Sequence, residues 1–97
     1  MKPVTYPRKK IIEVLRTLEE IVVSLDRLGS AEHEMSKEEA DATLANFIRR
    51  HDIFRKTARA RRILSDAFSR KAGKDGMDEL ERKMQDVPYW KPRGRER

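Results

Sequence analysis

Cysteine is absent from this chain of 97 residues, and histidine occurs only twice. The lack of cysteine excludes a disulfide framework, a thiol nucleophile and a zinc knuckle. His33 and His51 lie in different segments and lack the i, i+4 pairing of a helix-borne metal site. We therefore expect neither a metal nor a cofactor.

Long hydrophobic runs are also missing. No apolar run is long enough to span a bilayer, and no apolar segment follows Met1-Lys2-Pro3 as it would in a secretory signal. We expect no membrane contact and, by default, a cytoplasmic location.

The sequence motifs of familiar catalytic sites are missing as well. There is no glycine-rich phosphate loop, no G-x-S-x-G elbow and no H-E-x-x-H motif. The acidic neighbours Glu19–Glu20 and Glu38–Glu39 would point in different directions on a helix, so they could not share one substrate. The sequence predicts a protein that is not an enzyme.

Charge, by contrast, is abundant, since 41% of the residues are charged and 37% are hydrophobic. This balance is typical of exposed amphipathic helices and coiled coils. The length allows a single domain over residues 1–97 with little core per residue. Self-association would be a reasonable way to bury more apolar surface.

The clearest helical pattern lies in residues 8–28, after an N-terminal arm of residues 1–7. Pro7 suits the first turn of this helix, and Gly29 is expected to end it at the C′ position. Eight apolar residues at heptad spacing form one broad face: Ile11, Val14, Leu15, Leu18, Ile21, Val22, Leu25 and Leu28.

A second helix is expected after residue 36, where Ser36 and Glu39 have the pattern of a capping box. Acidic residues fill its first turn and arginines its last, which complements the helix dipole. A third helical pattern covers residues 52–71.

The junction between these two patterns has two interpretations. The apolar faces of residues 40–48 and 53–68 are offset by about 150° on a straight helix, so one partner surface cannot serve both. We favour a break at residues 50–52, with Asp52 as N-cap of the next helix. The alternative is one long helix in a hairpin that dimerises through the apolar face of residues 8–28.

The C-terminal part is expected to contain one short helix. A turn at residues 72–76 would let Gly73 end the third helix and Asp75 cap the next. Apolar spacing predicts a helix over residues 77–86, followed by a basic aromatic tail over residues 89–97.

These elements predict an all-α fold. We expect a small antiparallel helical bundle of three main helices plus a short C-terminal helix, over residues 8–88. A homodimer is the open alternative to a monomer.

Positive charge is concentrated in residues 46–72, whose net charge is +7. The whole chain has a net charge of +6, so the other residues nearly balance one another. Arg55, Arg59 and Arg62 are spaced one turn apart opposite the apolar face, so we expect an outward row. Guanidinium groups bind phosphates and carboxylates bidentately. The same row could be a solvated face that only keeps the protein soluble. The arginine candidates for a binding site are Arg49, Arg50, Arg55, Arg59, Arg61 and Arg62.

Tyr89, Trp90 and Lys91 form a second candidate site. Trp90 is expected to fold back over the end of the bundle, as a large amphipathic ring readily does. The alternative is an aromatic anchor for a partner's pocket or for base stacking.

Two functions remain open. The first is a non-catalytic interaction module, a small accessory or regulatory protein that binds a larger acidic protein through its basic helix and aromatic tail. The second is nucleic-acid binding, with the arginines of residues 49–62 on the phosphate backbone. A helix-turn-helix reader is disfavoured because the turn at residues 50–52 lacks glycine and few base-reading side chains accompany the arginines. We rank the protein partner first.

Overall fold

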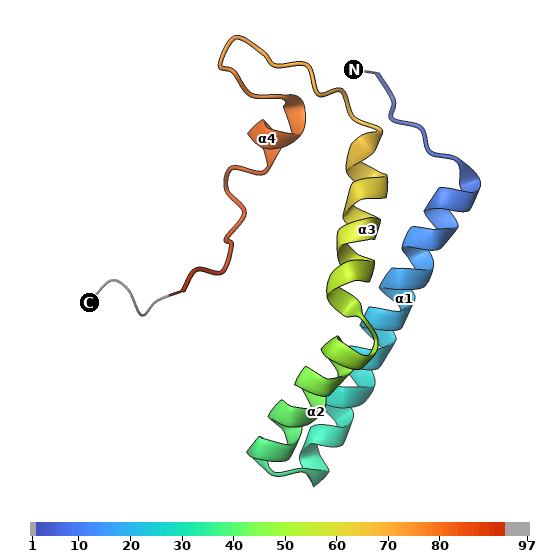
Figure 1. The fold of residues 1–97 in the computed structure, drawn as a ribbon, viewed down its shortest axis with the longest axis vertical. Coiled ribbons are helices and arrows are strands. Elements are labelled where there is room, and N and C mark those ends of the chain that lie inside the picture. Colours follow the sequence, from blue (N-terminus) through green and yellow to red (C-terminus); the bar gives the residue numbers. More distant parts are fainter. Residues whose placement is uncertain (1, 93–97) are drawn as a thin grey trace. The chain divides into compact units, whose positions relative to one another are not determined.

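The computed structural model describes residues 2–92 (Figure 1). Regular structure in this range is entirely helical, with no strand. The chain divides between Ala67 and Phe68 into two compact units, and each unit is described by itself. Three long helices pack against one another in the first unit, which confirms the all-α prediction. The single domain over residues 1–97 stays a prediction.

The first long helix, α1, runs Arg8–Ala31. The carbonyl of Pro7 accepts hydrogen bonds from the backbone N–H groups of Lys10 and Ile11 at 3.0 and 3.2 Å. The prediction that Gly29 ends this helix is wrong, because α1 continues through Gly29 to Ala31. A Cβ at Gly29 would meet no atom within 4 Å, so packing does not require a glycine there.

The turn η1 (Glu32–Glu34) leads from α1 to the helix α2 (Lys37–Arg50). The predicted capping box is confirmed. The backbone N–H of Glu39 donates to Ser36 Oγ at 3.1 Å, and the N–H of Ser36 donates to Glu39 Oε1 at 3.4 Å. These two bonds satisfy donors that the first turn of a helix leaves without intrahelical partners.

The helices α2 and α3 (Ile53–Asp66) are separate, so the break that we favoured is confirmed. Asp52 occupies the N-cap position of α3 with a left-handed φ of 56°, which aspartate tolerates better than most residues. The prediction that its side chain caps α3 is wrong, because the Asp52 carboxylate pairs with Arg55 instead.

The C-terminal end of α3 lies at Asp66, short of the predicted end at Lys71, so Gly73 does not end this helix. The hydroxyl of Tyr6 donates to the carbonyl of Leu64 at 2.7 Å. This bond satisfies one of the carbonyls that the last turn of a helix leaves free, and it ties the N-terminal arm to α3.

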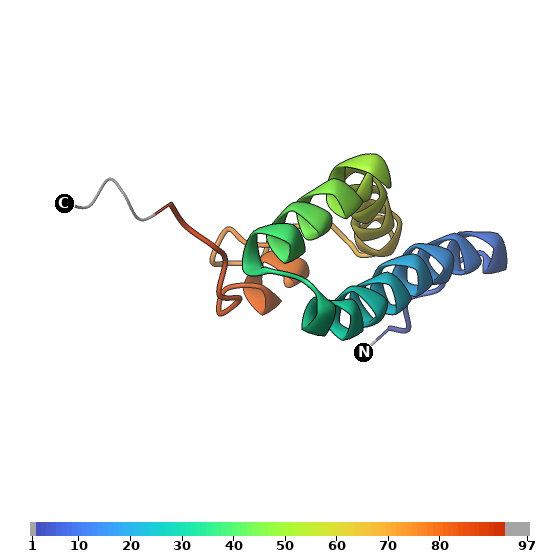
Figure 2. The ribbon, with the colours of Figure 1, turned by 90° about the horizontal axis from the view of Figure 1, so that it is seen from below.

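The hydrophobic core of the first unit is small. Its buried apolar side chains are Val14 from α1, Phe47 from α2, and Ile53 and Ala60 from α3. Figures 1 and 2 show α1 on one side and α2 with α3 on the other. Within its unit, α1 therefore has helical neighbours on one side only.

The second unit contains one short helix, α4 (Glu79–Lys83). Asp78 caps it, since the N–H of Glu81 donates to Asp78 Oδ1 at 2.8 Å. The prediction that Asp75 is the cap is wrong. Asp75 accepts hydrogen bonds from Arg82 at 2.9 and 3.0 Å, and this contact holds the pKa of the Asp75 carboxyl well below its usual range. The helix is also shorter than the predicted residues 77–86.

Candidate partner-binding surface

The arginines of the basic row predicted on α3 differ in their partners. Arg59 faces α1, where its guanidinium forms two hydrogen bonds with the carboxylate of Glu13, one of them 3.1 Å from Nη2 to Oε1. This pairing lowers the pKa of Glu13 and raises that of Arg59. The prediction that Arg59 points outward together with Arg55 and Arg62 is therefore wrong.

A second contact between α1 and α3 centres on Glu20. Lys56 Nζ donates to Glu20 Oε1 at 2.8 Å, and His51 Nδ1 lies 2.9 Å from Oε2. The hydrogen bond from Lys56, followed by the one with His51, lowers the pKa of Glu20. The His51 ring also lies 4.9 Å from that of Phe47, centroid to centroid. His51 thus links α1 to the α2–α3 corner.

The other candidate arginines differ in their partners. Arg55 pairs with Asp52 at the start of α3. The remaining four are exposed, and within residues 2–92 their side chains make no ion pair or hydrogen bond: Arg49, Arg50, Arg61 and Arg62. A partner could bind these four without displacing a contact inside the protein.

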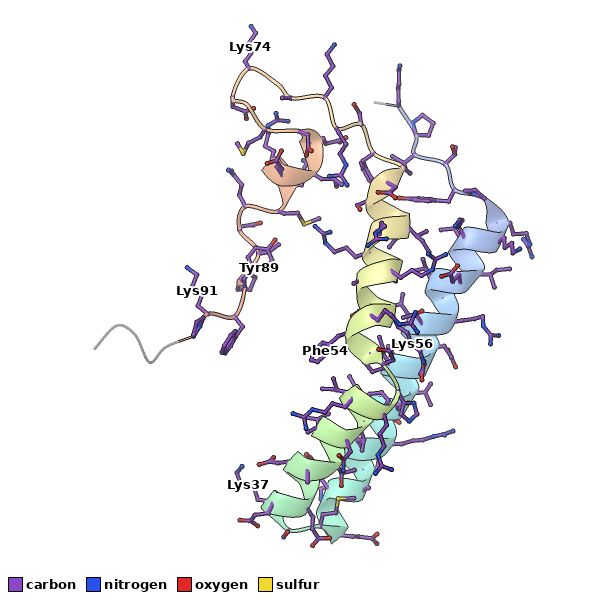
Figure 3. The ribbon with its side chains drawn as sticks, viewed as in Figure 1. Lys37, Phe54, Lys56, Lys74, Tyr89 and Lys91 are labelled. Atoms are coloured by element: carbon purple, nitrogen blue, oxygen red, sulfur yellow. The ribbon has the colours of Figure 1, made fainter. Side chains whose placement is uncertain are left out.

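Phe54 was not among the binding residues predicted from the sequence. Its side chain is 73% exposed, and Figure 3 shows it on the side of α3 opposite Lys56. The signal was present, because Phe54 lies about 100° from Ile53 and therefore off the apolar arc of the helix. One arc of about 120° holds six residues of α3, of which Ser65 is buried. We call the five exposed ones the outer face of α3: Phe54, Arg55, Ala58, Arg61 and Arg62.

A groove borders this face on the side of the N-terminal arm. It has a volume of about 340 Å³, and its lining includes Tyr6, Lys10, Arg59 and Arg62. The lining also includes Asp66, so the groove is cationic with one acidic group at its end. Arg62 therefore belongs both to the outer face of α3 and to this groove.

The predicted tail site belongs to the second unit. Tyr89 and Lys91 are exposed, and Trp90 is 83% exposed (Figure 3 labels Tyr89 and Lys91). The residues of its own unit leave the indole uncovered, so burial of Trp90 against the bundle is not confirmed. Residues 93–97, the rest of the predicted tail, lie outside the described residues.

The outer face of α3 carries guanidinium groups and one exposed aromatic ring. Guanidinium groups beside an exposed aromatic ring can bind carboxylates or phosphates next to an apolar group. Across residues 2–92, no cluster of three or more histidine, aspartate or glutamate side chains is placed to hold a metal. No helix in the described range is both long enough and apolar enough to cross a bilayer.

Comparisons of this chain with protein-family models, with curated proteins and with solved structures found no match.

Proposed function

We propose that this chain is a non-catalytic interaction module, an accessory or regulatory protein that binds a larger acidic protein through the outer face of α3. The observation that carries this proposal is that the exposed ring of Phe54 shares one side of α3 with Arg61 and Arg62, about two turns further along, whose side chains have no partner within the described residues. Aromatic residues and arginine are the types that contribute most of the energy in protein interfaces.

The charge of the surface indicates an acidic partner. Arg61 and Arg62, with Arg49 and Arg50 at the end of α2, are not neutralised inside residues 2–92. Such charges raise association rates with a surface of opposite sign and suppress binding to basic proteins. The exposed Trp90 offers a second aromatic contact for the same partner.

Nucleic acid is the alternative partner. The same arginines could neutralise phosphates, and an exposed phenylalanine can stack on a base. The pairing of Arg55 with Asp52 and of Arg59 with Glu13 favours a protein. These pairs occupy two of the three arginines whose one-turn spacing would suit successive phosphates. The side chains that remain unpaired on the outer face of α3 include the apolar ring of Phe54.

We propose that the helices of the first unit form an antiparallel bundle. Glu13 meets Arg59 and Glu20 meets Lys56, so rising numbers in α1 correspond to falling numbers in α3. The uncovered side of α1 further supports self-association, through a surface distinct from the outer face of α3.

Photo-crosslinking tests the proposed function. The full-length chain would carry benzoylphenylalanine in place of Phe54, with a matched control at Ala42, which is exposed on α2. Each chain is irradiated in an extract of its native host. We expect a discrete adduct from position 54 and none from position 42, and we expect protease but not nuclease to destroy it.

The charge dependence of the adduct separates a specific contact from chance proximity. Arg61→Glu with Arg62→Glu should abolish the adduct from position 54. The matched control, Arg16→Glu with Arg27→Glu on α1, should leave it unchanged, since both arginines are exposed but lie outside the outer face of α3. Loss of the adduct on nuclease treatment would support the nucleic-acid alternative, while equal adducts at both positions would refute a site on α3.

A further inference from the structure

We infer that a second copy of this chain covers the exposed apolar side of α1, with the two α1 helices antiparallel about a two-fold axis near residue 20. Four residues define the contact, which we call the α1 seam: Leu15, Leu18, Val22 and Leu25. They are 57%, 47%, 62% and 45% exposed, respectively. Their 3-4-3 spacing is that of the a and d positions of a coiled coil.

The α1 seam adjoins the face that α1 uses inside its own unit. Val14 is buried there, and Glu13 and Glu20 reach α3. The centre of the seam lies roughly 60° from Val14 and roughly 170° from Glu13 and Glu20, toward the side where Figures 1 and 2 show no neighbouring helix of the first unit. The apolar face of α1 is therefore wider than the part that its own unit covers, and the seam is the exposed remainder.

The size of this surface suits a modest dimer. Ile12 and Leu44 are 44% and 41% exposed, and Leu25 and Leu44 line one groove between α1 and α2. If each of the six side chains leaves on the order of 80 Å² uncovered, the patch offers roughly 500 Å² per copy, near the upper end for a monomer. The charged groups at its edges bring it toward the ~800 Å² that each partner buries in a standard interface.

The pattern is compatible with two-fold symmetry. An axis near residue 20 sets Leu15 opposite Leu25 of the second copy, and Leu18 opposite Val22. Each pair then occurs twice, as an isologous interface requires. The same register sets Arg8 of one copy opposite Glu32 of the other.

The charges at the two ends of α1 indicate a second copy and select the antiparallel orientation. Arg8, Lys9 and Lys10 open the helix, whereas residues 29–45 at its far end carry a net charge of −4. Antiparallel helices place these opposite charges together, and parallel helices would place like charges together. A surface with one sign at each end is complementary to itself, unlike the cationic outer face of α3.

The oligomeric state of the full-length chain tests this inference. Sedimentation equilibrium should give twice the chain mass of 11.4 kDa. Leu18→Glu with Val22→Glu should weaken the dimer roughly 100-fold or more, because it buries charge at the centre of the interface. Phe54→Glu, an equally drastic change on the outer face of α3, should leave the dimer intact. Circular dichroism checks that each variant keeps its helices.

A charge exchange tests the orientation without disturbing the seam. Arg8→Glu and Glu32→Lys should each weaken the homodimer, while an equimolar mixture of the two variants should restore association. A strict monomer at about 1 mM chain, or a dimer that survives the seam substitutions, would overturn the inference. Failure of the mixture to associate better than either variant alone would overturn the antiparallel arrangement.

Discussion

Phe47 and Phe54 lie seven residues apart, and replacing each with alanine tests the corner between α2 and α3. On one continuous helix the two rings would share a face, because seven residues make almost two full turns. The corner separates them, so that Phe47 is 9% exposed and Phe54 is 73% exposed. The same substitution should therefore have very different effects at the two positions.

The expected magnitudes follow from burial. Removing a buried phenylalanine side chain costs about 3–5 kcal/mol, and the partial exposure of Phe47 places it near the lower end of that range. A chain segment of this size has a total stability of roughly 3–10 kcal/mol. Phe47→Ala should consequently remove much of the stability of the first unit, while Phe54→Ala should change it by no more than ~0.5 kcal/mol.

Urea denaturation followed by far-ultraviolet circular dichroism, at one fixed chain concentration, measures both effects. With a slope of about 1 kcal/mol per molar urea, the Phe47→Ala midpoint should fall by about 3 M or the variant should be unfolded in buffer. Similar losses for both variants would contradict the corner, and a loss of less than about 1 kcal/mol for Phe47→Ala would contradict its place in the core.

Three further predictions concern single positions. Gly29→Ala should stabilise α1 by about 0.5–1 kcal/mol, because the glycine is helical and its Cβ position is open; a lower urea midpoint would contradict this. Ser36→Ala should cost about 1 kcal/mol by removing the bond to the N–H of Glu39, and an unchanged midpoint would argue against the cap. The pKa of Glu20 is lowered from 4.5, chiefly by the hydrogen bond from Lys56. The ionised Glu20 side chain therefore stabilises the fold fully above pH 4.5, and this stabilisation is lost as the pH falls through the lower pKa of the folded state. Thermal melts should show Glu20→Gln less stable than the parent near neutral pH, with the difference shrinking on acidification below pH about 4.5; a constant difference would contradict the pairing.

Local features of the fold could be predicted from the sequence. The capping box at Ser36 and the break before Ile53 depend on neighbouring residues and on helical phase, and both are present. Gly29 misled the prediction because glycine at a helix end is a preference and not a requirement. The end of α3 was placed too late because the apolar spacing continues to Phe68, whereas the helix ends at Asp66. The bond from Tyr6 to the carbonyl of Leu64 joins residues 58 apart, so nothing local to Leu64 indicates it.

The candidate site could be predicted only in part, since periodicity gives the phase of a side chain and not its neighbour. Arg59 and Glu13 are 46 residues apart and meet across two helices, and nothing local to either residue indicates the pair. Phe54, in contrast, could have been recognised from its phase on α3. Pairing across α1 and α3 thus decides which arginines remain available.

Nuclear magnetic resonance of the isotope-labelled full-length chain, titrated with an extract of its native host, shows residue by residue where a partner binds. If the outer face of α3 binds an acidic protein, the backbone amide signals of Phe54, Ala58, Arg61 and Arg62 should broaden first. Nuclease treatment of the extract should leave this effect unchanged, and Arg61→Glu with Arg62→Glu should abolish it. Broadening spread evenly over the chain, or none on α3 at any extract concentration, would contradict the claim.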